Sequence, residues 1–326
     1  MTAVTVVIPN WNGARHLPSA IASLQAQTLA PARLLVVDNG SADGSDGWAE
    51  RAGCDVIRLG FNRGFAPAVN AGIAITTTPY VSIFNNDAEA EPEWLAALVG
   101  ALESRPEKWF ACGKILRASD PGIIDGCFDC VSLGRMPWRC GYGYRDSPAW
   151  NRRADVSVAP LTAALARREL FNRVGMLDES FESYLEDVDF GIRCAVAGYG
   201  GLYEPEAVAR HWGSATLGVW RSETVRRLSR NQVFLARKHP PRTWASQAGW
   251  SIVAAQLLWG MVALKHGAVY PWLCGKIQGI LARPGWGPNL EKERTDSILR
   301  REEERIRQLQ AEAGADRYWR AYFALT

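Results

Sequence analysis

Apolar and polar positions alternate along the first hundred residues in a way that predicts strands separated by helices. Four apolar runs have the length and β-branched content of buried strands, at residues 4–9, 34–38, 56–59 and 80–84. Amphipathic helices are predicted between and after them, at residues 14–27, near Trp48, at 66–75 and at 93–104. Strands that are apolar on both faces and alternate with helices indicate an α/β fold, with a mostly parallel sheet covered on both sides.

The pattern changes twice further along the chain. Residues 110–158 are rich in glycine, arginine and aromatic residues, which predicts long loops over the sheet. A helix that contains Leu165, Leu170 and Phe171 is expected next, then a helix opened by the acidic residues 186–189 and a strand that ends near Arg210. Beyond it we expect helices, so the chain divides into a catalytic domain at residues 1–218 and a C-terminal helical region at 219–326.

Composition narrows the class of protein. A chain of 326 residues with 48% hydrophobic content can bury one large core, or a catalytic domain with an appendage. The net charge of +3 is too small for a polybasic nucleic-acid binder, so no nucleic-acid partner is expected. Seven irregularly spaced cysteines, with no secretory signal at the N-terminus, indicate a cytoplasmic protein with reduced thiols.

Polar residues follow each of the four predicted strands, and ligands of parallel α/β sheets bind beyond those carboxyl ends. They are Asn10 and Asn12, then Asp38 and Asn39, then residues 62–64, and then residues 85–87. The first turn reads Pro9-Asn10-Trp11-Asn12-Gly13, without the glycine pattern that a dinucleotide pyrophosphate needs. The turn after Asp38 could equally be a plain turn in which Ser45 caps a helix.

Two further groups carry candidate chemistry. Asp87 could bind Mg²⁺ or Mn²⁺ that neutralises a leaving diphosphate, with His211 as a neutral imidazole ligand, although a turn aspartate and a buried histidine are common without metal. Glu186, Asp187 and Asp189 form a carboxylate cluster suited to a general base. The alternative is a helix N-terminus enriched in acids that complement its dipole.

Taken in this order and at these spacings, four groups resemble the family 2 glycosyltransferases, in particular a rhamnosyltransferase-like branch that builds bacterial cell-surface polysaccharides. The four are the turn after Asp38, the turn at residues 85–87, the acidic cluster at 186–189 and His211. The resemblance covers roughly residues 4–240 and includes Asn62-Arg-Gly-Phe, Asn70-Ala-Gly and the Asn85-Asn-Asp87 variant of an Asp-x-Asp motif. It implies a GT-A fold and an inverting, metal-dependent reaction. Asn85 replaces the first carboxylate of the motif, so fewer carboxylates are offered to the metal.

The resemblance also implies roles for single residues. Asp187 would be the catalytic base, Glu186 would orient the acceptor beside it, Asp38 would contact a pyrimidine base, and Asp87 and His211 would hold the metal. The residues expected to bind the donor are Pro9, Asn10, Asn12, Asp38, Asn39, Asn62, Gly64, Asn70, Asn86 and Asp87. Those expected on the acceptor side are Tyr184, Trp138 and Arg139.

The expected function is transfer of a sugar, with rhamnose suggested by the resemblance alone, from a dTDP- or UDP-sugar to a glycan or lipid-linked glycan. One alternative is a nucleotidyltransferase, which would need a Gly-rich loop with Lys or Arg after the first strand. Another is a non-catalytic protein that binds a nucleotide sugar or a glycan through a degenerate site. The sequence also allows a homo-oligomer.

The C-terminal third suggests a membrane surface as a partner. Residues 219–242 are rich in arginine, and residues 243–264 carry no charge but contain Trp244, Trp250 and Trp259. This favours amphipathic helices in the cytoplasmic leaflet, and therefore a cytoplasmic enzyme that is peripheral on the inner face of the cell membrane. A spanning helix, or an ordinary core or oligomer surface, are the alternatives.

Overall fold

A computed structural model describes residues 3–213, 220–284, 286, 291–314 and 316–326. The chain forms two compact units, which are described separately. The first contains Met1–Asp129 and Gly141–Gly213, and the second contains Cys130–Cys140 and Ser214–Thr326. The predicted domain boundary between residues 218 and 219 lies outside the described residues. The short segment 130–140 belongs to the second unit, which the sequence pattern did not indicate.

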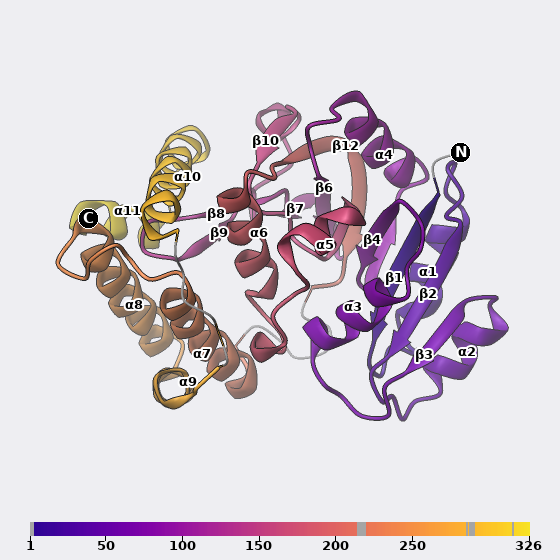
Figure 1. Cartoon of the computed structure of the whole chain (residues 1–326), viewed down its shortest axis with the longest axis horizontal. Helices are drawn as coiled ribbons and strands as arrows, with labels where there is room; N and C mark the ends of the chain where they lie inside the picture. Colours follow the sequence, from indigo (N-terminus) through magenta and orange to yellow (C-terminus); the bar gives the residue numbers. More distant parts are fainter. Residues whose placement is uncertain (1–2, 214–219, 285, 287–290, 315) are drawn as a thin grey trace. The chain divides into compact units, whose positions relative to one another are not determined.

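A twisted sheet forms the centre of the first unit, in the order β10-β12-β6-β11-β4-β1-β2-β3, with β5 paired to β12 and β7 to β6 (Figure 1). Strands β1, β2, β3 and β4 run parallel, whereas β11 is antiparallel to both β4 and β6. The predicted α/β fold with a mostly parallel sheet is therefore confirmed. The strands of this sheet are β1 (Val4–Asn10), β2 (Arg33–Asp38), β3 (Asp55–Arg58), β4 (Tyr80–Phe84), β5 (Ala88–Ala90), β6 (Phe110–Arg117), β7 (Asp120–Gly126), β10 (Ala154–Val156), β11 (Ala163–Arg167) and β12 (Gly201–His211).

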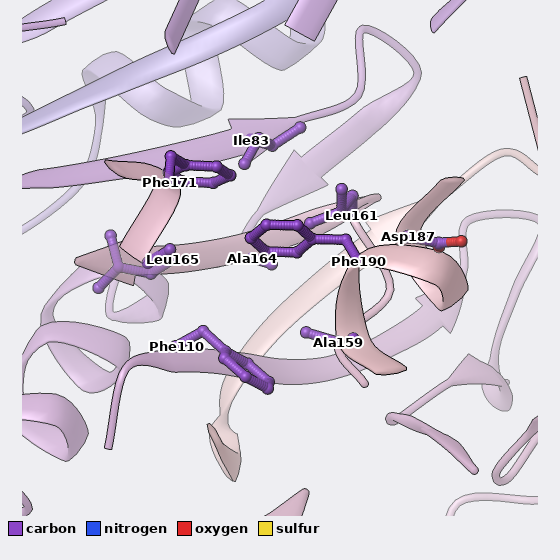
Figure 2. A pocket seen from close by; sticks show the side chains of 11 residues that line it. Ile83, Phe110, Ala159, Leu161, Ala164, Leu165, Phe171, Asp187 and Phe190 are labelled. Carbon is purple, nitrogen blue, oxygen red and sulfur yellow. The ribbon is translucent and has the colours of Figure 1, made fainter. Parts of the chain in front are cut away.

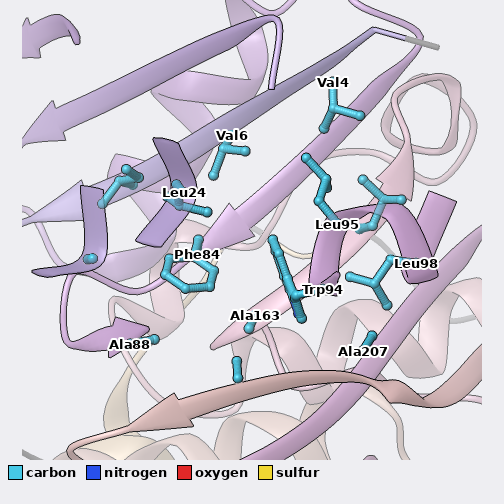
Figure 3. Packing of buried hydrophobic residues seen from close by; sticks show 14 of the residues in the cluster. Val4, Val6, Leu24, Phe84, Ala88, Trp94, Leu95, Leu98, Ala163 and Ala207 are labelled. Carbon is cyan, nitrogen blue, oxygen red and sulfur yellow. The ribbon is translucent and has the colours of Figure 1, made fainter. Parts of the chain in front are cut away.

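Helices cover the sheet and close its core. They are α1 (Leu17–Gln25), α2 (Ser45–Arg51), α3 (Phe65–Ala74), α4 (Trp94–Ser104), α5 (Glu169–Val174) and α6 (Glu186–Ala197), with 3-10 turns at Pro148–Trp150 and Glu179–Phe181. Trp94 of α4 packs edge-on against Phe84 of β4, with ring centroids 5.0 Å apart, inside a buried apolar cluster (Figure 3). This packing fixes the end of β4, where the polar residues 85–87 begin.

Two local predictions were wrong. Residues 110–158 are not long loops, because they contain strands β6, β7 and β10 as well as β8 (Asp129–Val131) and β9 (Pro137–Arg139). Leu165 lies in strand β11 rather than in a helix, and the following helix α5 begins only at Glu169. In both places, pairing with neighbouring strands decides the structure, and pairing between distant residues leaves little trace in local periodicity.

The second unit is helical, as expected for the C-terminal region. It contains α7 (Ser222–Lys238), α8 (Gln247–Lys265), α9 (Val269–Leu281), α10 (Lys292–Ala313) and α11 (Arg317–Leu325). The segment 130–140 is tied into it by Arg135, which is fully buried and whose guanidinium donates to the His239 carbonyl at 2.9 Å and pairs with Asp296. Backbone N–H groups of Leu133 and Gly134 donate to Glu303 and to the Tyr322 hydroxyl.

Lys276 of α9 gives the second unit a pH-dependent stability. Its ammonium is buried and donates to the side-chain oxygens of Gln232 and Gln256, and burial lowers its pKa from 10.5 to about 7. Between pH 7 and 10.5 the unfolded chain binds more protons than the folded one, so stability rises with pH. Urea unfolding from pH 7 to 10 should show a gain of roughly 3 kcal/mol in the wild type relative to Lys276→Met. Equal pH slopes would contradict this.

Candidate active site

The carboxyl ends of β1 and β2 meet in a hydrogen-bonded group of buried polar side chains. Asn10 lies opposite Asp38 in the strand register, and its amide donates to the Asp38 carboxylate at 3.2 Å and to Ser45 at 2.9 Å. The second Asp38 oxygen accepts from the backbone N–H groups of Gly40 and Ser41. Asp38 is only 3% exposed, but a carboxylate offers about four acceptor positions, so room for one more donor remains.

A second asparagine links the next strand end to this group. The Asn39 amide donates to the Gly64 carbonyl at 2.9 Å and to the Asn62 side-chain oxygen at 3.0 Å, and its own oxygen accepts from Arg63. Asn12 is exposed and adopts a positive φ of 50°, with its side-chain oxygen bonded to the Ala42 N–H at 2.9 Å. The Asn39 N–H also donates to the Asn10 carbonyl at 2.7 Å, so polar residues at the first three strand ends belong to one hydrogen-bonded group.

Gly64 brings the loop before α3 against the segment that precedes α6. The Glu182 carbonyl accepts from the Ala66 N–H at 2.9 Å, and the Ser183 hydroxyl accepts from the Phe65 N–H at 3.1 Å. Gly64 has a φ of +100°, and a Cβ there would lie 2.7 Å from the Glu182 carbonyl oxygen. Only glycine permits this approach, so Gly64 is required for packing of the two loops, and its contact with the donor stays a prediction.

Replacing Gly64 by alanine should therefore both strain the backbone and push the two loops apart. We expect a loss of roughly 1–3 kcal/mol of stability together with lower transferase activity. The matched control is Gly100→Ala in the middle of α4, where a Cβ meets nothing within 4 Å and where stability should stay level or rise. Thermal unfolding of both variants measures the difference, and equal melting temperatures would contradict the packing argument.

The segment before α6 holds a strained backbone. Glu182, Tyr184 and Leu185 all have positive φ, at 59°, 74° and 67°, although none is glycine. Such conformations cost free energy and persist where surrounding contacts impose them, as they often do at functional sites. They turn the chain sharply so that α6 begins directly at Glu186. Tyr184, expected on the acceptor side, is half-buried in this turn.

The three carboxylates of α6 have different environments. Asp189 is fully buried and pairs with Arg193 at 2.9 Å, while the same guanidinium donates to the Val174 and Met176 carbonyls. Asp189 therefore anchors the helix. Asp187 is half-buried, and Figure 2 shows its carboxyl group at the margin of an apolar cavity, pointing away from Phe190. Glu186 is buried beside it at the start of the helix.

His211 stands between two carboxylates. Its Nε2 is 3.2 Å from Asp87 and its Nδ1 is 2.8 Å from Asp125, and all three residues are buried. Strand pairing creates this arrangement, because His211 at the end of β12 lies opposite Ala88 of β5, directly after Asp87. Asp125 comes from β7. Sequence reasoning missed Asp125, since nothing local marks an aspartate in an apolar strand as the partner of a histidine 86 residues away.

The two carboxylates control the charge of the imidazole. Burial opposes the charged form, but the hydrogen bonds to Asp125 and Asp87 outweigh it and raise the pKa of His211 to about 9. A divalent cation bound at Nε2 would take the place of the proton on that atom. Asp125 would then hold Nδ1–H and fix the ring, as carboxylates commonly do beside metal-bound histidines.

The variant motif at residues 85–87 also has an unsatisfied oxygen. The side-chain oxygen of Asn85 is buried without a hydrogen-bond partner, and the Asn86 amide donates to Asn10 at 2.8 Å. An amide oxygen is an acceptable ligand for Mg²⁺ or Mn²⁺. Among the described residues there is no set of three or more His, Cys, Asp or Glu side chains that could hold a metal. A cation at Asp87 and His211 would thus need ligands from the substrate.

Some of the predicted site residues lie outside the hydrogen-bonded groups described above. Trp138 lies on β9 in the segment that belongs to the second unit, and its indole is 7% exposed, so its place on the acceptor side stays a prediction. Arg139 follows it on the same strand. The Asn70 amide is occupied by the Leu177 carbonyl and by Glu179, which ties α3 to the segment before α6. Pro9 lies within β1, paired with Val37. Donor contacts of Asn70 and Pro9 stay predictions.

Comparison with known proteins agrees with the site. The model of the family described as "Glycosyl transferase family 2" matches residues 5–125 of this chain. A Mycobacterium tuberculosis protein named N-acetylglucosaminyl-diphospho-decaprenol L-rhamnosyltransferase is 29% identical over 279 residues, covering 76% of this chain and 88% of that protein. A Mycobacterium bovis protein named as an uncharacterized glycosyltransferase is 37% identical over 197 residues, covering 60% of this chain and 81% of that protein.

A solved structure shows the same fold. The crystal structure of GalNAc-T7 with UDP, GalNAc and Mn²⁺ superposes with a TM-score of 0.60 at 13% identity, covering 89% of this chain and 59% of that one. The order of the strand-end motifs, the sheet and the sequence relatives agree with one another. The chain belongs to glycosyltransferase family 2 and is a glycosyltransferase of the GT-A fold.

Proposed function

We propose that this glycosyltransferase moves a sugar from a dTDP- or UDP-sugar to a glycan or lipid-linked glycan acceptor, with inversion at the anomeric carbon. Rhamnose is the first candidate for the sugar, because the relative that is 29% identical over most of its length is named a rhamnosyltransferase acting on a diphospho-decaprenol carrier. The observation that carries the proposal is the contact between the donor loop at Gly64–Ala66 and the strained segment that opens the acidic helix α6.

Asp187 is the proposed general base. Its carboxylate lies at the start of α6, where the structure leaves it half-buried, whereas Asp189 is neutralised by Arg193 and cannot serve. Asp187 would take the proton of the acceptor hydroxyl as that oxygen attacks the anomeric carbon from the face opposite the nucleoside diphosphate. A single displacement of this kind inverts the configuration. Glu186, buried beside it, would orient the acceptor.

The residues around His211 fit a divalent cation. Asp87 and His211 Nε2 would hold Mg²⁺ or Mn²⁺, the buried Asn85 oxygen is available in the same motif, and Asp125 would fix the imidazole. When bound, such an ion stabilises the negative charge of the departing diphosphate. The crystal structure of GalNAc-T7, which has the same fold, contains Mn²⁺ together with UDP, and this supports the assignment.

A thermal-shift screen of nucleotide sugars tests the donor. A donor that binds only the folded chain raises the melting temperature by mass action, so dTDP-rhamnose with Mn²⁺ should stabilise the protein more than GDP- or ADP-sugars do. Release of the nucleoside diphosphate, followed with a lipid-linked glycan as acceptor, then tests transfer. A purine nucleotide sugar that stabilises best would overturn the donor assignment. The nucleotidyltransferase alternative is further weakened because the Asn10–Gly13 turn packs against Asn86 instead of forming an open phosphate loop.

A further inference from the structure

Two consecutive helices of the second unit each expose a continuous row of large apolar side chains. On α8 the exposed residues recur at helical spacing, and they are Trp250, Val253, Leu257, Met261 and Leu264. On α9 they are Tyr270, Leu273, Ile277, Ile280 and Leu281. Leu264, Leu281 and Tyr270 are 66%, 72% and 79% exposed. Contiguous apolar surface of this kind on a soluble protein marks a site of interaction.

The opposite sides of these helices are packed inside the second unit. Ala248, Ile252, Ala255 and Leu258 of α8 are buried, and the Tyr318 hydroxyl donates to the Ala255 carbonyl at 3.2 Å. Gly275 and Gly279 of α9 pack so closely on α7 that a Cβ at either position would clash with the α7 backbone. The rows are therefore the outward sides of helices that the protein already holds in place.

Helix α8 has the length and composition of a membrane span, but its surroundings argue for a different position. It is the one described helix that meets both criteria, and 44% of its apolar stretch is buried inside the structure. Gln256 on α8 accepts from the buried Lys276 of α9. The protein-facing side of α8 is mostly apolar and is packed within the second unit, while the other side exposes the apolar row. A helix held to its own protein along one side can rest the other side in a membrane interface without crossing the bilayer.

The charge of this region is one-sided. Residues 224–290 contain no Asp or Glu, and we call them the acid-free stretch. The stretch contains nine basic residues, Arg226, Arg227, Arg230, Arg237, Lys238, Arg242, Lys265, Lys276 and Arg283. The whole chain, by contrast, has 37 basic and 34 acidic residues, so acidic residues are excluded from this stretch and not from the protein in general.

Exposed cationic and aromatic side chains stand near the ends of the apolar rows. Lys265 ends α8 and Arg283 follows α9, and both are exposed. Arg237 is exposed too, and its guanidinium donates to the Gly279 and Ala282 carbonyls at the C-terminal end of α9, at 2.6 and 2.8 Å. Trp244 and Trp250 are 59% and 50% exposed, and tryptophan is favoured at the level of lipid headgroups.

We propose that the apolar rows of α8 and α9 dock on the surface of an anionic lipid bilayer, with their side chains among the acyl chains and the exposed Arg237, Lys265 and Arg283 at the headgroups. Apolar burial and attraction of cations to anionic lipid act together in such binding, and neither α8 nor α9 needs to cross the membrane. The rows contain none of the residues proposed for the transfer chemistry. Its test uses no sugar donor, so its outcome is independent of the proposed function.

Sedimentation of the full chain with vesicles tests the proposal. The wild type should sediment with phosphatidylcholine vesicles that contain phosphatidylglycerol, and far less with phosphatidylcholine alone. Leu257→Glu and Ile280→Glu should each lower the partition coefficient at least about tenfold, because each removes an apolar side chain from the rows and adds a negative charge. The matched control is Ile75→Glu at the end of α3, an apolar residue that is 43% exposed outside the rows and should bind as the wild type does.

A charge series separates electrostatic attraction from apolar burial. Lys265→Glu combined with Arg283→Glu should lower binding to the anionic vesicles several-fold, whereas Arg301→Glu on the exposed side of α10 should not. Melting temperatures confirm that each variant folds. Resistance of the bound protein to carbonate extraction would overturn the proposal in favour of a spanning helix. The proposal would also be overturned if every variant bound vesicles as the wild type does. The same holds if Leu257→Glu dissociated a dimer and left vesicle binding unchanged, because the rows would then be a surface between two copies of the chain.

Discussion

Asp187→Asn is expected to lower the rate of sugar transfer by roughly 10²–10⁴-fold while it leaves binding of the nucleotide sugar nearly unchanged. The carboxamide keeps the size and the hydrogen-bonding oxygen of the side chain, which accepts from the Val188 N–H at 2.8 Å, but it cannot accept the proton of an acceptor hydroxyl. The measurement is the initial rate of transfer under saturating donor, together with calorimetric titration of the donor.

Asp189→Asn is the informative comparison, because it makes the same chemical change two residues further along α6. Asp189 is fully buried in its pair with Arg193, so this variant should lose stability and should lose activity only in proportion to the folded fraction. If Asp187→Asn turned over at near-normal rates, or if it lost donor affinity as strongly as rate, the assignment of Asp187 as base would fail.

The contrast between these two aspartates shows which parts of the site could be predicted from the sequence and which could not. Four strand ends, the acidic helix start and the position of His211 could be predicted because each lies directly after a local pattern of apolar residues. The same pattern could not separate Asp187 from Asp189. Their difference depends on Arg193, Val174 and Met176, whose positions are set by the packing of α6.

Other misses have the same physical origin. Trp138 and Arg139 were expected in a loop but lie on β9, next to Arg135, whose guanidinium contacts His239 and Asp296, residues that lie more than a hundred positions away. Pairing of β6 with β12 and β11 likewise turned an irregular composition into strands. Contacts between distant residues decided these cases, and no local periodicity encodes them.

His211→Ala is expected to weaken Mn²⁺ binding by more than the roughly 10–100-fold that removal of an outer-shell partner costs. The imidazole would supply one of the two protein ligands, and Asp87 alone would hold the ion only through the substrate diphosphate. Titration of Mn²⁺ followed by electron paramagnetic resonance, with UDP or dTDP present, measures the affinity directly and without turnover. The control is His266→Ala, a histidine at the end of α8 that stacks on Trp220.

Asp125 provides the finer test, because its effect should be indirect. Asp125→Ala removes the acceptor of Nδ1 and should cost about 10–100-fold in Mn²⁺ affinity, while Asp125→Asn retains an acceptor oxygen and should recover part of that loss. Because Asp125 is buried, both variants need melting temperatures near that of the wild type for the comparison to hold. Equal affinity in wild type, Asp125→Ala and His211→Ala would show that the ion is held elsewhere. The pair Asp87 and His211 would then be a buried ion pair that stabilises the junction of β5 with β12.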